Sequence, residues 1–538
     1  MVFAELRFAR ATDTTPCTSQ NMLLSLSAVT RSATEEGEFS PERVREWLSS
    51  LSAADTMVSA RALIDRVVEM NRTELPGRIR LRVLDMFRDH ADWLLPQLET
   101  RIARAQPPLA GTHRQVAYFI EKLLKELAAG YARTVLRVPR AWLSIGFKSQ
   151  LQLPLVRAMD FHARRLALSQ RLYARSPGAV WGEMHQLYRL AREWGVAERE
   201  TESPQTSPVR IYRDTLLLAF AQPSKLNHGD FARVQSLLAQ HGDLAQVAPA
   251  GPVSDPLCVF AIDPRRDQPG VAYAKRANAG LEDGELMLVT HKLVERIQAH
   301  LKKIQDGVAP ASLGLPDEAV RLSYQELLQR LIVHWRGERK QRTARMRFHP
   351  RVELWVGLRD IWRLLRAESP HDTPAADITQ REAPTKASEW VVLNESSRGF
   401  ALNYMSGGLP PISVGEIVAI KSKDKGAVFV CFVRWVLSNN PEHFELGMQQ
   451  LAPVVVPAVY KPAEQERVAP EPILFFPEMP AQKRAAAVVA PPNRLRPDEE
   501  FSLRHRRGRL SLRASRVIEK TPSVELIEVV GNDRTDTR

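Results

Sequence analysis

Cysteine is scarce in this sequence, since only Cys17, Cys258 and Cys431 occur among 538 residues. They are odd in number and far apart, which excludes a disulfide framework and a zinc site and fits a reducing cytoplasm. No uninterrupted apolar run approaches the roughly 18 to 20 residues of a membrane-spanning helix. The charges of Met1–Arg7 stand where a signal peptide needs an apolar region. We therefore expect a soluble cytoplasmic protein without a transmembrane segment.

The linear signatures of common active sites are also missing. The 13 histidines are scattered, no His-x-x-x-His pair occurs on one helix and no carboxylates cluster, so no metal site is expected. There is no Gly-x-x-x-x-Gly-Lys-Ser/Thr loop, no Gly-x-Ser-x-Gly elbow and no dinucleotide-binding glycine fingerprint. His162 and His185 stand among helical residues and are expected to be packing or surface histidines. An effector or adaptor without a cofactor is favoured over an enzyme.

What the sequence does have is positive charge, because 75 Lys and Arg against 62 Asp and Glu give a net charge of +13. This balance favours an anionic partner, whether a nucleotide, a nucleic acid or a membrane surface. The hydrophobic content of 44% is that of a globular protein. A chain of this length exceeds a single core, so roughly two to four domains are expected.

Helical periodicity dominates the first half of the chain. Residues 1–40 lack a period and are expected to be a flexible lead-in, and Ser40 followed by Pro41 has the pattern of a helix start. The apolar stripes that follow are Ala60, Leu63, Ile64, Val67 and Asn71; Leu84, Phe87, Ala91 and Leu94, ending at Pro96; Val116, Phe119, Ile120, Leu123, Leu127 and Tyr131; and Val180, Met184, Leu187, Ala191 and Trp194. No constant repeat length relates them. They predict an α-helical bundle or irregular solenoid over residues 41–250.

The pattern of residues 251–340 predicts a mixed segment of strand and helix. Cys258–Ile262 has the pattern of a short strand, and Glu285–Ile304 and Glu318–Trp335 have those of two amphipathic helices. The second helix leads into a run of arginines.

A strand-rich region follows over residues 341–455. The apolar strand Trp390–Leu393 runs directly into Asn394, Ser396 and Gly399, spaced as Asp/Asn-x-Ser-x-x-Gly. Further strands are expected at Val414–Ile420, Ala427–Val436 and Phe444–Leu451, the last with the sequence Glu-Leu-Gly-Met-Gln. Motif and strands together resemble a PilZ domain, the small β-barrel that bacteria use as a receptor for cyclic di-GMP. The resemblance implies an antiparallel β-barrel and a bacterial signalling protein that binds this nucleotide.

The family's other motif, Arg-x-x-x-Arg, should precede the first strand. Arg347 and Arg351 have that spacing directly ahead of Val352–Leu358, and Arg342 or Arg345 replaces Arg347 if the motif is shifted. A guanidinium can fork onto a phosphate and onto the O6/N7 edge of guanine, and cyclic di-GMP offers both groups. The Asn amide can both donate to and accept from guanine, the Ser hydroxyl can reach a phosphate, and Gly allows close backbone approach. The polar insertion Glu368–Ser388 is longer than the family usually carries.

Beyond this region, residues 456–470 are rich in proline and are expected to be a linker. Residues 471–538 are expected to form a β-rich C-terminal module, with a hairpin at Arg506–Arg509. This module is strongly basic through Arg504, Arg506, Arg507, Arg509, Arg513 and Arg516. The arginines are explained either as a solvated face or as a nucleic-acid or acidic-lipid patch, and the lack of interleaved aromatics counts against single-stranded nucleic acid.

Three functions agree with these patterns. The first is a cyclic di-GMP effector whose barrel senses the nucleotide and whose helical region contacts a partner protein. The second is a scaffold whose PilZ-like barrel binds no ligand, and the third is a basic nucleic-acid-binding protein. The sequence carries no linear signature of domains that synthesise or hydrolyse cyclic di-GMP.

Overall fold

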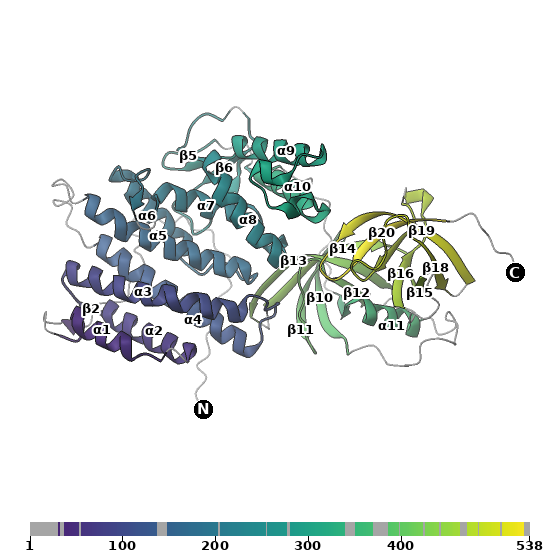
Figure 1. The fold of residues 1–538 in the computed structure, drawn as a ribbon, viewed down its shortest axis with the longest axis horizontal. Helices are drawn as coiled ribbons and strands as arrows, with labels where there is room; N and C mark the ends of the chain where they lie inside the picture. Colours follow the sequence, from purple (N-terminus) through teal and green to yellow (C-terminus); the bar gives the residue numbers. More distant parts are fainter. Residues whose placement is uncertain are drawn as a thin grey trace.

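The computed structural model places a helical region at one end of the molecule and two β-barrels at the other (Figure 1). It describes residues 31–32, 37–52, 55–136, 148–202, 205–253, 255–276, 280–338, 350–368, 386–396, 399–422, 426–440, 443–462, 471–482, 484–505 and 508–531. This is the multidomain α+β architecture that the sequence predicts. Within these ranges, no helix combines the length and the apolar character that crossing a membrane requires.

The helical region buries the predicted stripes in one shared core. Its helices are α1 (Pro41–Ser50), α2 (Thr56–Arg72), α3 (Gly77–Ile102), α4 (Gly111–Leu136), α5 (Lys148–Arg171), α6 (Val180–Glu193), α7 (Pro208–Phe220) and α8 (His228–His241). Two short strand pairs, β1 (Arg31–Ser32) with β2 (Thr73–Glu74) and β3 (Thr201–Glu202) with β4 (Gln205–Thr206), accompany them. Ser40 and Asn227 cap α1 and α8, accepting hydrogen bonds from the backbone N–H groups of Arg43 and Asp230.

The expectation that a helix ends at Pro96 is wrong, because α3 continues through this proline to Ile102. A proline inside a helix removes one backbone hydrogen bond and costs about 3 kcal/mol. The apolar stripe continues past it, with Leu98 and Ile102 at 0% and 1% exposure. Burying two such side chains contributes about 1.5 to 3 kcal/mol each, which offsets that cost.

The mixed segment is a four-stranded antiparallel sheet with two helices. Its strands are β5 (Gln246–Pro249), β6 (Val259–Ile262), β7 (Val271–Ala272) and β8 (Leu286–Val289), in the order β5-β8-β6-β7, and its helices are α9 (His291–Gln305) and α10 (Leu322–Arg336). The helix expected from Glu285 therefore begins only at His291. The apolar run Leu286–Val289 alternates between buried and half-buried residues and pairs on both sides, so it forms a central strand.

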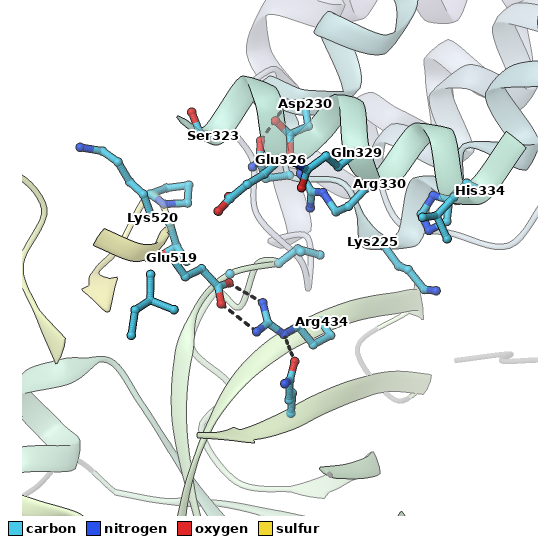
Figure 2. A pocket seen from close by; sticks show the side chains of 18 residues that line it. Lys225, Asp230, Ser323, Glu326, Gln329, Arg330, His334, Arg434, Glu519 and Lys520 are labelled. Carbon is cyan, nitrogen blue, oxygen red and sulfur yellow. Dashed lines mark hydrogen bonds and ion pairs between the residues drawn. The ribbon is translucent and has the colours of Figure 1, made fainter. Parts of the chain in front are cut away.

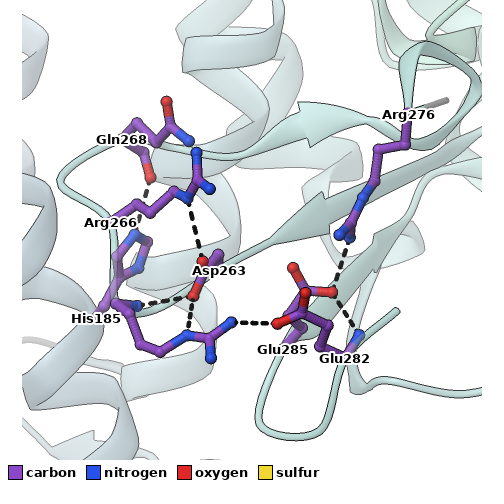
Figure 3. A network of polar contacts seen from close by, with 8 residues as sticks. His185, Asp263, Arg266, Gln268, Arg276, Glu282 and Glu285 are labelled. Carbon is purple, nitrogen blue, oxygen red and sulfur yellow. Dashed lines mark hydrogen bonds and ion pairs between the residues drawn. The ribbon is translucent and has the colours of Figure 1, made fainter. Parts of the chain in front are cut away.

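Polar contacts join this sheet to the helical region, and Figure 3 shows the one between His185 of α6 and the carbonyl of Gln268. The loop after β6 carries Asp267, whose carboxylate accepts hydrogen bonds from the backbone N–H groups of Ala179, Trp181 and Gly182 at the start of α6. In α6, His185 lies between the Tyr212 hydroxyl and the Gln268 carbonyl, at 2.7 and 2.9 Å. Both of its ring nitrogens are partnered, and burial lowers its pKa. His185 is thus a packing histidine, as the sequence predicts.

The first barrel is closed and six-stranded. Its strands are β9 (Arg351–Val356), β10 (Ser388–Ser396), β11 (Gly399–Ser406), β12 (Ile417–Ser422), β13 (Val428–Asn440) and β14 (His443–Ala452), in the order β10-β11-β14-β13-β12-β9. Trp390, Leu402 and Phe444, each at 0% exposure, lie in its core. Helix α11 (Leu358–Glu368), which the sequence reading did not anticipate, packs against the outside.

The C-terminal β-rich module is a second closed barrel of six strands. They are β15 (Val456–Pro462), β16 (Glu471–Phe476), β17 (Ala487–Ala490), β18 (Glu500–His505), β19 (Gly508–Lys520) and β20 (Glu525–Gly531), in the order β15-β16-β17-β20-β19-β18. Strands β18 and β19 form the predicted hairpin. The expected linker over residues 456–470 is instead strand β15 as far as Pro462. Pro457 pairs only with β16 and Pro462 only with β18, so each proline has one free side where its missing N–H is tolerated.

The two barrels share a hydrophobic core, with α11 between them. Ile417 and Phe432 from the first barrel, Leu474 from the second and Trp362 from α11 all lie in this cluster. The Trp362 indole Nε1 donates to the carbonyl of Ala458 at 2.8 Å. The barrels therefore pack as one unit.

The helical region contacts the first barrel through buried backbone. Tyr173, at 3% exposure, packs with the core of the barrel, and its carbonyl accepts a hydrogen bond from the N–H of Ser438 at 2.8 Å. The carbonyl of Pro107 likewise accepts from the N–H of Ile412 at 2.8 Å. The Tyr173 contact holds β13 at the junction of the two halves (Figure 1), and the Pro107 contact holds the loop between β11 and β12.

Candidate functional site

The motif residues lie on the outer face of the first barrel. In β9 and β10, Val352, Trp390 and Val392 point into the barrel core. Side chains alternate along a strand, and directly paired residues share a face. Arg351, which pairs with Val391, therefore points outward. A bulge follows Val392, after which Asn394 pairs with Ala401 and Ser396 with Gly399, on the same outward face.

Arg351 and Asn394 are two polar groups of this face that can contact a ligand. Arg351 is exposed and Asn394 is half-buried, and neither side chain has a hydrogen-bond or ion-pair partner among the described residues. Asn394 lies three residues beyond Val391, the partner of Arg351, which is roughly 10 Å along an extended strand. The flexible arginine side chain can bridge most of that distance. A guanidinium and a carboxamide are thus available to one ligand.

Ser396 and Gly399 have structural roles at the end of the β10–β11 hairpin. The Ser396 hydroxyl donates to the carbonyl of Gly399 at 3.2 Å. A Cβ on Gly399 would stand 1.9 Å from the carbonyl oxygen of Met448 on β14, so no side chain fits there. The sequence reading explained this glycine by close approach of a ligand. Close approach of a neighbouring strand also requires it.

The remaining predicted ligand residues, Arg342, Arg345 and Arg347, lie outside the described residues. They belong to the segment that joins α10 to β9. The described chain resumes at Pro350, whose carbonyl accepts from the N–H of Val392 at 3.0 Å.

The outer face continues across the barrel beyond the motif. On β14, Gln449 pairs with Gly399 and Gly447 pairs with Ala401. Gly447 in turn lies under the indole of Trp435 on β13, since a Cβ there would stand 1.7 Å from its Nε1. Small residues therefore separate the motif from Trp435 and Gln449.

A cavity of about 550 Å³ opens beside Gln449, where the helical region meets both barrels (Figure 2). Its charged and polar lining includes Lys225, Asp230, Glu326, Gln329, Arg330 and His334 from the helical region, Arg434 and Gln449 from the first barrel, and Glu519 and Lys520 from the second.

Ion pairs line this cavity. Arg434 forms two hydrogen bonds with the Glu519 carboxylate and donates from Nε to Gln449 Oε1 at 2.9 Å. Arg330 contacts Asp230 at 2.7 Å. The Glu326 carboxyl has no partner among the described residues, and burial, followed by the nearby negative charge of Glu519, raises its pKa. Sequence reasoning missed these residues, because they come from segments far apart in the chain.

The described residues contain no group of three or more His, Cys, Asp or Glu side chains arranged to hold a metal ion. A helical region joined to a barrel with an available arginine and asparagine has the make-up of a multidomain ligand-binding protein. Residues 42–251 match the family described as "Cyclic-di-GMP receptor FimW, N-terminal domain". Over 522 residues, the chain is 24% identical to the Cyclic-di-GMP receptor FimW of Pseudomonas aeruginosa (strain PAO1), with 84% of each chain covered. These similarities support a relationship to cyclic di-GMP receptors.

Proposed function

We propose that this protein is a cyclic di-GMP-binding effector. Its first barrel is a PilZ-like sensor of the nucleotide, and its helical region delivers the signal to a partner protein without catalysing a reaction. The observation that carries this proposal is the placement of Arg351, Asn394 and Ser396 on one outward face, with the first two side chains unpaired. The similarity to a cyclic-di-GMP receptor over most of the chain supports it independently.

The chemistry of these residues suits the ligand. Cyclic di-GMP is a dianion with two guanines. Arg351 can fork onto a phosphate or onto guanine O6 and N7, and the Asn394 amide can both donate to and accept from a base edge. The Ser396 hydroxyl can reach a phosphate oxygen. The ligand then lies across β9 and β10, outside the barrel.

A second arginine can come from the segment before β9. Arg347 precedes Pro350 by three residues in the sequence and lies outside the described residues. Pro350 is hydrogen-bonded to Val392, two residues before Asn394. We propose Arg347 as the second arginine of the site, with Arg345 or Arg342 in its place if the motif is shifted.

Isothermal titration of the full chain with cyclic di-GMP tests the proposal. Charge-assisted hydrogen bonds contribute about 1.5 to 3 kcal/mol each, so Arg351→Ala should weaken binding roughly ten- to a hundredfold. Arg351→Lys should cost nearly as much, because an ammonium loses the planar fork. Ser396→Ala should cost less, about 1 kcal/mol, as expected for a neutral hydroxyl. Absence of heat at about 100 μM nucleotide, or wild-type affinity in the Arg347/Arg351 double alanine variant, refutes it.

A ligand-free scaffold is the second candidate. The structural roles of Ser396 and Gly399 favour it, because the β10–β11 hairpin needs these residue types even without a nucleotide. A wild-type protein that gives no binding heat would establish this alternative.

A nucleic-acid-binding role is the third candidate, and it concerns the second barrel. Arg504 and Arg509 are direct partners on β18 and β19, and Glu500 and Arg513 pair four positions further along the same hairpin. Arg506 and Arg507 lie outside the described residues. Salt-dependent binding to duplex DNA at this barrel would support the role, since each phosphate contact adds to the salt slope.

A further inference from the structure

We propose that Gln449 is a further ligand-contacting residue of the nucleotide site and that Glu519 of the second barrel positions it through Arg434. This inference rests on the proposed function. It gives the second barrel a role in ligand recognition, because Glu519, whose carboxylate holds Arg434 toward the Gln449 amide, lies on β19.

The first step is the location of Gln449. Residues Ser396, Gly399 and Gln449 are direct partners on three adjacent strands, β10, β11 and β14. Met448 points into the barrel core, so Gln449 points outward, toward the same side as Ser396. Adjacent strands lie about 4.8 Å apart, and Gly399 between them carries no side chain. A ligand held by Ser396 therefore has bare backbone beneath it and the Gln449 amide roughly 10 Å away.

The second step is the orientation of the amide. Arg434 Nε lies 2.9 Å from Gln449 Oε1. A guanidinium has only donors, so the amide must turn its oxygen toward Arg434 and its NH₂ group away. Gln449 is the direct strand partner of Gly399, so these two donors are available to a ligand that lies over that glycine. Phosphate oxygens and the O6 and N7 atoms of guanine are acceptors, so these donors suit either half of a guanine dinucleotide.

The third step is the control of Arg434. Its two terminal nitrogens are both hydrogen-bonded to the Glu519 carboxylate, and its guanidinium lies over the Phe432 ring at 5.4 Å. These contacts leave Nε directed at Gln449. Arg434 and Glu519 are thus positioning residues, and Glu519 also neutralises the arginine charge.

Calorimetric titration with cyclic di-GMP of a matched set of variants tests the inference. Gln449→Glu keeps the oxygen that faces Arg434 but replaces the two donors with negative charge against a dianion. It should weaken binding on the order of a hundredfold, whereas Gln449→Ala should weaken it about tenfold. Gln329→Glu is the control, because Gln329 lines the same cavity from α10 but is not a strand neighbour of Gly399. It should leave the affinity within about twofold.

A double-mutant cycle tests the positioning role. Glu519→Gln should weaken binding about fivefold in the wild-type background and have no effect when Gln449 is already alanine. A merely structural role of Glu519 would instead add the same loss in both backgrounds. Glu519→Asp should restore part of the affinity.

Hydrogen–deuterium exchange on the unmutated full chain gives a second readout that does not depend on variant folding. Cyclic di-GMP should slow exchange of backbone amides in β14 around Gln449, and the distant strand β20 should not change. If Arg351→Ala weakens binding but Gln449→Glu does not, this inference alone is overturned. Unchanged exchange in β14 on binding overturns it as well. Absence of wild-type binding overturns the proposed function as well.

Discussion

At the scale of single residues, Gly399 is required for the packing of its strand, and this requirement can be measured without any ligand. A methyl group at position 399 would overlap the carbonyl oxygen of Met448, which is backbone and cannot rotate away. We expect Gly399→Ala to lower the stability of the barrel unit by about 1 to 3 kcal/mol through overpacking, measured as the thermal midpoint without nucleotide. Gly408→Ala is the control, because nothing lies within 4 Å of its added Cβ. Equal midpoints for both variants would show that the strands can separate at Gly399.

A second residue-scale prediction concerns acid sensitivity. Burial, followed by the positive charge of Arg165, lowers the pKa of His162 from 6.5 to about 3. The unfolded chain binds this proton below pH 6.5 and the folded chain does not, so stability falls as pH falls from about 6.5 to about 3. His162 alone should contribute a slope of about 1.4 kcal/mol per pH unit in this window.

Urea unfolding followed by far-ultraviolet circular dichroism measures this slope. We expect His162→Gln to reduce it, and His291→Gln to leave it unchanged, because the His291 side chain is 59% exposed. A wild-type slope in the His162 variant would show that other groups govern the acid response.

At the scale of elements, the cost of a substitution to the stability of the helical region depends on how deeply the replaced side chain is buried. Leu187 on α6 is at 0% exposure, Phe119 on α4 is only half-buried, and its neighbour Tyr118 is 58% exposed. Aspartate at Leu187 should destabilise the region by about 3 to 5 kcal/mol, at Phe119 by about 1 to 2, and at Tyr118 by less than about 0.5. Thermal unfolding of the three variants checks this order, and Leu187→Asp melting with the wild type would mean that α6 packs through another face.

The elements also show where local sequence patterns succeed. Ser40 caps α1 as expected, because capping depends on residues two or three positions away. The hairpin of β18 and β19 was likewise predicted from alternation around a tight turn. Helix α11 has a local signal of its own, because Ile361, Trp362, Leu364 and Leu365 stand at helical spacing. The continuation of α3 through Pro96 instead depends on the burial of Leu98 and Ile102 against distant segments.

At the scale of the whole molecule, the second barrel completes the outer face of the first. Ile417, Ala419 and Phe432 are each at 0% exposure, and all three lie in the core shared between the barrels and α11. Truncation after Ala452 should therefore expose an apolar face and produce aggregation or strong binding of a hydrophobic dye.

Limited proteolysis of the intact chain provides the complementary measurement. The shared core predicts that the C-terminal barrel resists removal and is lost only when the first barrel also unfolds. Rapid, complete loss of everything after Pro470 while the remainder survives would contradict this prediction.

The sequence by itself determined the nature of each part: a helical first half from apolar spacing, strands after residue 350 from alternation, and a candidate motif at Asn394, Ser396 and Gly399. These properties depend on neighbours a few positions away. Tertiary structure decided that the C-terminal strands also close into a barrel, and that Gly399 lies against Met448. It also brought Gln449, Arg434 and Glu519 together. Such contacts follow from strand register and domain packing, which sum many weak interactions between distant segments and leave no local pattern in the chain.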